Sequence, residues 1–269
     1  MVVFPNCKIN IGLNIIARRP DGFHNIESCF YPVGWTDILE IIPAESFSFT
    51  SSGIDIPGEV AGNLCVKAYH FLQEDFSLPP VNIHLHKVIS IGAGLGGGSA
   101  DGAFTIKLLN QIFELNLSST QMQEYARRLG SDCAFFIENT PVFCYGKGDQ
   151  FSPIQLDLSK YFIILVNPQI HVGTAEAYAG IIPAEPDMKI GEILQLPIEQ
   201  WKAHLVNDFE KSLFAKYPDI KAVKDTLYNR GALYASMSGS GSTVYGIFAR
   251  ETEVKHLFPE PYQIWQGNL

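Results

Sequence analysis

The sequence has no long hydrophobic run and few charged residues. Its longest uninterrupted apolar segment, residues 161–166, is far shorter than the roughly 20 residues that a membrane-spanning helix needs. The N-terminus has no signal-peptide core, because a proline and polar residues interrupt it. Only 17% of the 269 residues are charged, and the net charge is −9. These absences predict a cytoplasmic protein that binds neither membranes nor nucleic acid. A small anionic ligand would need only a local cluster of donors.

Closely spaced cysteine pairs are also missing. The five cysteines stand at positions 7, 29, 65, 133 and 144, and no two form a Cys-x-x-Cys pair. An odd number at this spacing argues against a zinc site or a disulfide framework, so we expect reduced thiols.

The hydrophobic patterns alternate between strands and helices. A chain of 269 residues forms one large or two modest domains. The first half is rich in strands and then helical, and the second half mixes both. This predicts an α+β fold with two domains, residues 1–158 and 159–269. The patterns predict strands at residues 2–16, 24–33, 37–42, 46–50, 81–87, 161–166, 233–238 and 243–249, and helices at 63–76, 99–115, 119–129 and 216–230.

A glycine run between a predicted strand and a predicted helix is the clearest motif. Glycine allows positive φ and lets an anion approach the backbone amides. A helix N-terminus adds free N–H groups and partial positive charge. A flexible linker or tight turn is the alternative, but five glycines in seven positions would make an entropically costly turn. We therefore predict a phosphate-binding loop, made of Ser90, Ile91, Gly92, Ala93, Gly94, Leu95, Gly96, Gly97, Gly98, Ser99 and Ala100.

Three common phosphate loops do not fit this run. Gly92, Gly94 and Gly97 match G-x-G-x-x-G, but a dinucleotide fold needs an acidic residue about 20 positions on, after a second strand, where this chain has a helix end. A Walker A loop needs Gly-Lys-Ser/Thr, and no lysine occurs between Lys87 and Lys107. A protein kinase needs His-Arg-Asp and Asp-Phe-Gly motifs, and neither is present.

The glycine run resembles the second motif of the GHMP kinases, named for galactokinase, homoserine, mevalonate and phosphomevalonate kinases. Pro-Asn-Cys-Lys-Ile-Asn at residues 5–10 resembles the first motif of that family, and Met-Ser-Gly-Ser-Gly-Ser at 237–242 resembles the C-terminal glycine motif. The resemblance spans nearly the whole chain. It implies a ribosomal-protein-like N-terminal domain that binds ATP and Mg²⁺, and a ferredoxin-like C-terminal domain.

Shorter segments are similar to one branch of the family. They are Arg-Arg-Pro-Asp-Gly-Phe-His at 18–24, Gly-Ser-Asp at 130–132 and Asn-Asp-Phe-Glu at 207–210. The resemblance implies two small-molecule substrates, ATP and a cytidine-diphosphate sugar alcohol. The expected reaction phosphorylates the 2-hydroxyl of 4-diphosphocytidyl-2-C-methyl-D-erythritol in non-mevalonate isoprenoid biosynthesis. Monomer and homodimer both stay open.

The resemblance also assigns catalytic roles. It makes Asp132 the base that accepts or orients the proton of the attacking hydroxyl. Lys8 would pair with Asp132 and either favour ionisation of that hydroxyl or steady the transferring phosphoryl group. Without the resemblance, Asp132 is more typical of a helix cap, and Lys8 could equally be an edge residue. Ser99 is the expected hydroxyl near Mg²⁺ or a plain N-cap, and both roles can hold.

Further residues are candidates for the acceptor site. Phe23, which stands where the family usually has tyrosine, can stack on the cytosine, and His24 can hydrogen-bond its edge. Lys87 is either a phosphate contact or a surface lysine at a strand end. His84 and His86 share a strand face, but with no third ligand we expect ordinary strand residues. Asn10 stands two positions after Lys8, so the period of two of a strand predicts that both side chains share one face. The candidate substrate residues are Asn10, Phe23, His24, Lys87, Thr174 and Tyr178.

Two other functions compete with this interpretation. The chain could be a GHMP kinase for homoserine, a mevalonate or a sugar, but the Asp-Gly-Phe-His segment would then have no explanation. It could instead be a silent sensor that binds ATP and a metabolite, but the presence of both Lys8 and Asp132 favours a catalyst.

Overall fold

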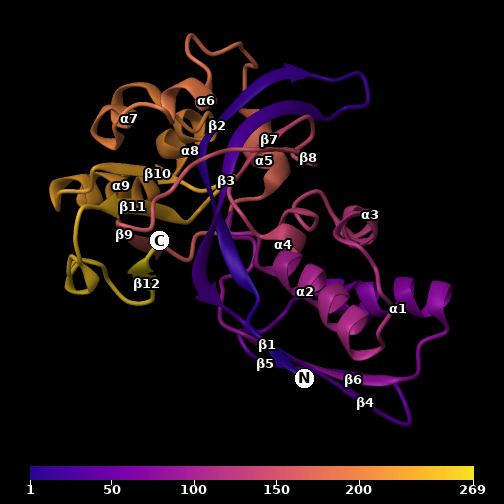
Figure 1. Cartoon of the computed structure of the whole chain (residues 1–269). Helices are drawn as coiled ribbons and strands as arrows, with labels where there is room; N and C mark the ends of the chain where they lie inside the picture. Colours follow the sequence, from indigo (N-terminus) through magenta and orange to yellow (C-terminus); the bar gives the residue numbers. More distant parts are fainter. The chain divides into compact units, whose positions relative to one another are not determined.

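The computed structural model describes all residues, 1–269, and divides them into two compact units. Unit 1 contains residues 1–7, 35–91 and 96–140, and unit 2 contains residues 8–34, 92–95 and 141–269 (Figure 1). The units are interleaved along the sequence, because the early residues Leu13, Ile15 and Ile26 pack into the hydrophobic core of the second half. The predicted boundary at residue 158 divides the chain into two consecutive domains, whereas these units are interleaved. The domain boundary therefore stays a prediction.

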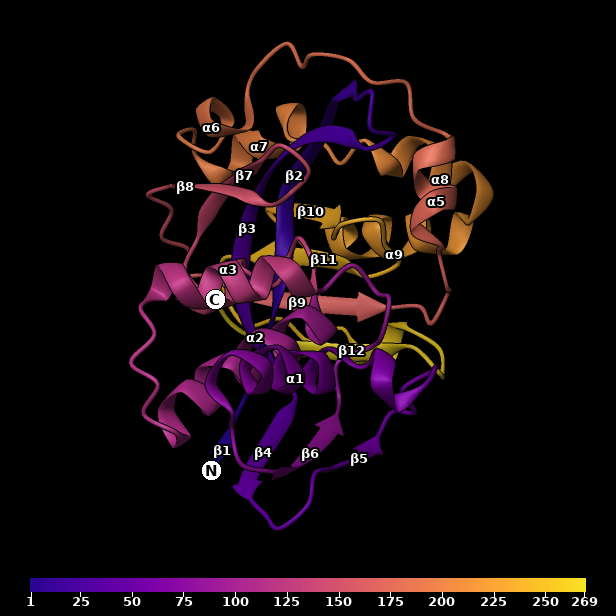
Figure 2. The ribbon, with the colours of Figure 1, turned by 90° about the vertical axis from the view of Figure 1, so that its right-hand side faces the viewer.

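Unit 1 is a four-stranded sheet covered by helices. Figure 2 shows α1 and α2 side by side above the strands, in the order β1-β4-β6-β5. Strand β6 alternates buried and half-buried residues, as expected for a strand with one face in the core. The strands are β1 (Val2–Val3), β4 (Ile38–Pro43), β5 (Ser48–Gly53) and β6 (Val81–Lys87), and the helices are η1 (Val60–Gly62), α1 (Leu64–Phe76), α2 (Gly97–Ile112), α3 (Ser119–Leu129) and α4 (Phe135–Glu138).

Unit 2 contains two four-stranded sheets, in the orders β10-β11-β9-β12 and β2-β3-β7-β8. Strand β9 is buried along its whole length because it lies between β11 and β12. Two of the strands are β2 (Asn6–Arg18), whose first two residues belong to unit 1, and β3 (His24–Thr36), whose last two residues belong to unit 1. The others are β7 (Val142–Tyr145), β8 (Gln150–Pro153), β9 (Phe162–Asn167), β10 (Tyr234–Met237), β11 (Val244–Phe248) and β12 (Gln263–Asn268). The helices are α5 (Thr174–Ala179), α6 (Ile190–Ile193), α7 (Ile198–His204), α8 (Phe209–Lys216), α9 (Pro218–Asn229) and η2 (Lys255–Leu257).

The α+β fold class is confirmed, and the long elements lie where the periodicity predicts them. The sequence patterns missed α4, α8 and the hairpin of β7 and β8, since four to eight residues give little periodicity to detect. All five cysteines are buried free thiols, as expected. None of the helices is long and apolar enough to cross a membrane.

Candidate active site

Three motifs far apart in the sequence meet inside unit 2. The amide of Lys8 donates to the carbonyl of Leu95 at 2.9 Å, and the amide of Thr243 donates to the carbonyl of Ala93 at 3.3 Å. The Ser238 hydroxyl donates to the Gly94 carbonyl at 2.8 Å. A Cβ on Gly94 would lie only 2.0 Å from the Ser238 carbonyl oxygen. Glycine is therefore required here for the glycine loop and the C-terminal motif to touch.

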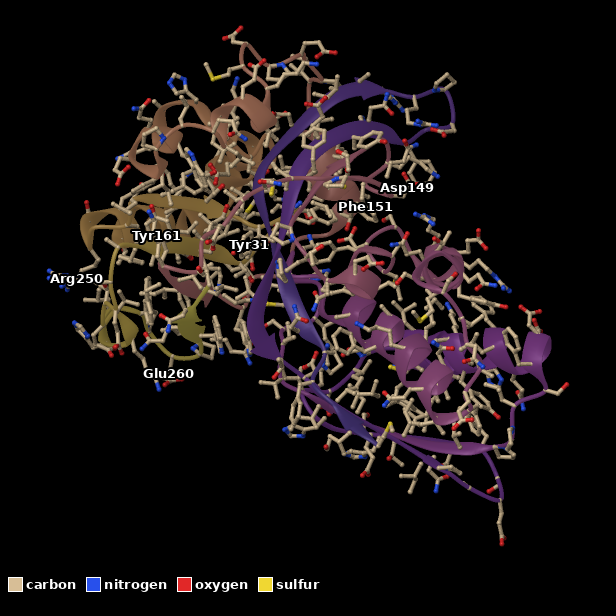
Figure 3. The ribbon with its side chains drawn as sticks, in the orientation of Figure 1. Tyr31, Asp149, Phe151, Tyr161, Arg250 and Glu260 are labelled. Carbon is tan, nitrogen blue, oxygen red and sulfur yellow. The ribbon has the colours of Figure 1, made fainter.

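The motif at residues 5–10 contains the buried ammonium group of Lys8. Lys8 is 3% exposed. Its Nζ donates to Asn10 Oδ1 at 2.5 Å and to the Gly94 carbonyl at 3.4 Å. The same Nζ lies 4.6 Å from the centre of the Phe30 ring. The Phe30 ring packs against Phe151 of β8, and Phe151 is labelled in Figure 3. The predicted shared face of Lys8 and Asn10 is confirmed, and the amide oxygen, the carbonyl and the ring together orient the ammonium.

Asn10 is held on every side by polar groups that the sequence interpretation missed. Its Nδ2 donates to the Ser28 hydroxyl at 2.9 Å, and Ser28 donates in turn to the Gly12 carbonyl at 2.6 Å. The backbone of Asn10 donates to Ser238 Oγ and accepts from the Tyr245 hydroxyl. The amide of Asn10 is therefore fixed in the orientation that presents its oxygen to Lys8.

The Asn-Asp-Phe-Glu motif at residues 207–210 holds the C-terminal glycine motif in place through hydrogen bonds. Asn207 Nδ2 donates to the carbonyls of Met237 and Gly239, both at 2.8 Å. Glu210 accepts from the Met237 amide at 2.8 Å. The sequence showed this motif only as a family resemblance. Its support of the glycine motif could not be predicted, because Asn207 and Met237 are 30 residues apart in the sequence.

In unit 1 the glycine loop leads into α2. The helix begins at Gly97, with Gly96 as a left-handed N-cap at φ 69°. Ser99 is thus the third helical residue, and the N-cap alternative for it was wrong. The Cys133 thiol is hydrogen-bonded to Ser99, and burial raises the pKa of Cys133 to about 11. Asp132 is half-buried beside Cys133. The structure therefore brings the segment of Asp132 against the first turn of α2.

Lys87 lies in a buried ion cluster of unit 1. It is 3% exposed, so the surface-lysine alternative was wrong. Its Nζ contacts Asp37 Oδ2, and lies 2.7 Å from Asp101 Oδ2. Burial lowers the pKa of Lys87, but the two carboxylates more than offset this and raise it above its usual value. Burial also raises the pKa of Asp101 to about 7, against the attraction of Lys87.

Four of the acceptor candidates, Phe23, His24, Thr174 and Tyr178, lie in unit 2. The rings of His24 and Tyr178 stack with centroids 4.8 Å apart. Thr174 and Tyr178 lie one turn apart on α5, and Thr174 is exposed. Phe23 is 59% exposed, with the Lys147 ammonium 5.3 Å from its ring centre. The structure brings His24 and Tyr178 together, while binding roles for these residues stay predictions.

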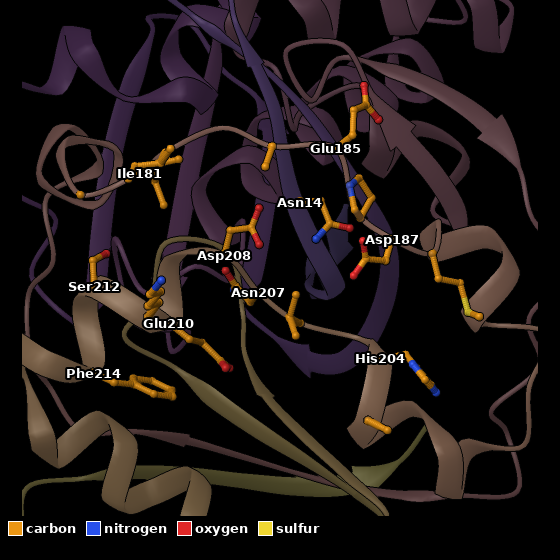
Figure 4. Close-up of a pocket in the computed structure, with 18 residues that line it drawn as sticks. Asn14, Ile181, Glu185, Asp187, His204, Asn207, Asp208, Glu210, Ser212 and Phe214 are labelled. Atoms are coloured by element: carbon orange, nitrogen blue, oxygen red, sulfur yellow. The ribbon is translucent and has the colours of Figure 1, made fainter.

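A cavity of about 950 Å³ in unit 2 lies apart from these candidates. Asn207, Asp208 and Glu210 line it (Figure 4), but none of the predicted site residues does. Asp208 accepts from the Ile15 amide at 2.7 Å, and the other two brace the glycine motif. Each of these three side chains therefore already has a hydrogen-bond partner within unit 2.

No group of three or more acidic, cysteine or histidine side chains could hold a metal ion. His84 and His86 bond instead to Thr50 and Ser52 of β5, so they are ordinary strand residues as expected. The half-buried hydroxyl of Ser99 at the start of α2 fits Mg²⁺, since Mg²⁺ keeps several waters and takes its remaining ligands chiefly from phosphates.

Two family models match the chain. The GHMP kinases N terminal domain matches residues 63–147, and GHMP kinases C terminal matches residues 190–260. The chain belongs to the GHMP kinase family, as the three motifs predicted.

Individual members of that family match over nearly the full length. A 4-diphosphocytidyl-2-C-methyl-D-erythritol kinase of Cytophaga hutchinsonii is 58% identical over 257 residues, 95% of either chain. One from Bacteroides fragilis is 50% identical over 273 residues and covers both chains completely. A crystal structure of 4-(cytidine 5'-diphospho)-2C-methyl-D-erythritol kinase matches with a TM-score of 0.79 at 28% identity, over 92% of this chain and 90% of the other.

Proposed function

We propose that the chain is a cytoplasmic kinase that transfers the γ-phosphoryl group of ATP to the 2-hydroxyl of 4-diphosphocytidyl-2-C-methyl-D-erythritol. The observation that carries the acceptor is the 58% identity, over 95% of both chains, to a relative named for that compound. The meeting of Lys8, the glycine loop and Ser238 in unit 2 supports a kinase site.

The phosphates of ATP are the proposed ligand of the glycine loop. Phosphoryl transfer requires positioning of the reactants and neutralisation of developing charge, with little covalent chemistry by the protein. Backbone amides of the glycine loop and the N-terminus of α2 would supply donors for an anion. Ser99 would share in holding Mg²⁺, which supplies further neutralising charge when bound.

Lys8 and Asp132 are the proposed catalytic pair, although Lys8 belongs to unit 2 and Asp132 to unit 1. Asp132 would accept or orient the proton of the 2-hydroxyl, because it is a half-buried carboxylate of the kind that serves as a general base in enzymes. Lys8, held by Asn10 at 2.5 Å, would direct its ammonium at the charge that develops on the transferring group.

The acceptor is proposed to bind through the hairpin of β2 and β3. The exposed ring of Phe23 would stack on the cytosine, and His24, steadied by its stack on Tyr178, would bond the edge of the base. Thr174, at the start of α5, would contact the same substrate.

ATP consumption with Mg²⁺ and a panel of acceptors tests the proposal. The panel contains the cytidine-diphosphate methylerythritol, homoserine, mevalonate and galactose. Turnover with the cytidine compound alone is expected. Turnover with another acceptor would keep the kinase and remove the proposed pocket. ATP binding without any turnover would favour the silent sensor.

A further inference from the structure

A buried cluster of three charged side chains lies in unit 1 at both ends of the glycine loop. Lys87 ends strand β6 just before the loop, and Asp101 lies in α2 just after it. Asp37 immediately precedes β4. The Lys87 ammonium contacts both carboxylates, and all three side chains are no more than 4% exposed. We name Lys87, Asp37 and Asp101 the loop-base triad.

The triad fixes the backbone that enters the loop. Asp37 Oδ1 accepts from the amides of Val88 and Ile89, at 2.6 and 2.8 Å. These two residues connect Lys87 to Ser90, where the loop begins. Hydrogen bonds to a charged acceptor are roughly twice as strong as neutral ones, so this segment has little freedom.

The triad also fixes the backbone that leaves the loop. A Cβ on Gly97 would lie 3.1 Å from the Lys87 ammonium and 3.0 Å from Cγ2 of Ile89. The first residue of α2 therefore packs directly on the triad, and a side chain there would have to displace it. Asp101, one turn further along α2, ties the same helix to Lys87.

One atom of the triad gains no partner within the protein. Asp101 Oδ1 is buried and accepts no hydrogen bond, and an unsatisfied buried polar atom costs free energy. A cluster that served stability alone would gain from satisfying this oxygen. The arrangement is thus better explained by what it does for the neighbouring loop.

We propose that Lys87, Asp37 and Asp101 are positioning residues that hold both ends of the glycine loop in the geometry that binds the ATP phosphates. The inference rests on the proposed function, because it takes ATP as the ligand of the loop. It gives Lys87 a role other than direct phosphate contact. One ammonium between two carboxylates leaves no net positive charge for a phosphate. A preorganised loop binds more tightly because less conformational entropy is lost on binding.

The affinity of the whole chain for Mg·ATP, measured by titration calorimetry, tests the triad. Asp101→Asn and Asp37→Asn keep the side-chain shape, and we expect each to raise the Kd and the KM for ATP five- to twentyfold. The KM for the acceptor and kcat at saturating ATP should stay within twofold. Lys107→Met is the control, because Lys107 lies on the same helix away from the loop, and its Kd should match the wild type.

A second variant leaves every charge in place. Gly97→Ala puts a methyl group against the Lys87 ammonium and should weaken ATP binding in the same range. The inference would be overturned if the two asparagine variants and Gly97→Ala all bound ATP with the wild-type Kd, whatever their melting temperatures. That result would not affect the proposed kinase function. A wild-type chain that binds no ATP would overturn the proposed function as well.

Discussion

Lys8 and Lys87 are equally buried, at 3% exposure each, but their surroundings differ. Lys87 contacts two carboxylates, so its charge is balanced within unit 1. The Lys8 ammonium in unit 2 contacts an amide oxygen, a backbone carbonyl and an aromatic ring, which orient it. Burial alone therefore does not separate a lysine that supports the fold from one suited to chemistry. What distinguishes Lys87 is the pair of carboxylates that its ammonium contacts.

Asp132 and Asp101 in unit 1 differ in a similar way, and substitution of Asp132 is expected to have the largest effect on activity. Asp101 is buried in the triad, whereas Asp132 is half-buried. If Asp132 is the base, Asp132→Asn should lower kcat by about 10²- to 10⁴-fold and leave the Kd of ATP within twofold. Single-turnover kinetics and nucleotide titration measure the two quantities. Parallel loss of binding and turnover would instead assign Asp132 to the fold.

The next effect concerns stability. Lys87→Met leaves Asp37 and Asp101 buried without their counter-ion, and breaking a buried pair in this way costs about 3–5 kcal/mol. Urea unfolding of the variant should show a free energy of unfolding lower by that amount. A loss below about 1 kcal/mol would mean that the triad is not a balanced ion cluster, and the comparison of the two lysines would fail.

Lys8→Met should show the opposite pattern. Loss of a charge aimed at the reacting group lowers kcat by about 10²- to 10³-fold. We expect the free energy of unfolding to fall by less than it does in Lys87→Met, because the bonds of Lys8 Nζ to Asn10 and Gly94 are made to neutral groups. The same urea titration and steady-state assay compare both lysine variants directly. Equal unfolding losses for the two variants would contradict the distinction.

Local periodicity and spacing account for what the sequence predicted correctly. The period of two placed Lys8 and Asn10 on one strand face, and the glycine spacing indicated the loop before α2. The surroundings of Lys87 could not be read in this way, because Asp37 lies 50 positions away and reaches it through the sheet. The pairing of strands β4 and β6 therefore decides what that lysine does.

At the start of α2, a local sequence signal wrongly indicated Ser99 as the N-cap. A serine before an apolar helix pattern is typical of an N-cap, yet the helix begins two residues before Ser99. Gly96 adopts a left-handed conformation at φ 69° and takes the N-cap position itself. Close packing of Gly97 on Lys87 fixes this start, and that packing is a tertiary contact that no local pattern contains.

The smallest expected effect is on kcat in a variant that disturbs the orientation of Lys8 and keeps its charge. Ser28→Ala removes the hydroxyl that accepts from Asn10 Nδ2 at 2.9 Å, and a lost buried hydrogen bond costs about 1 kcal/mol. We expect kcat to fall about fivefold, because Asn10 then holds the ammonium less firmly. Ser236→Ala is the matched control, since Ser236 is an equally buried serine that donates to Glu210 at 3.0 Å. It should lose similar stability and keep its kcat. Equal kcat values for the two serine variants would show that Lys8 needs only its charge and its strand position.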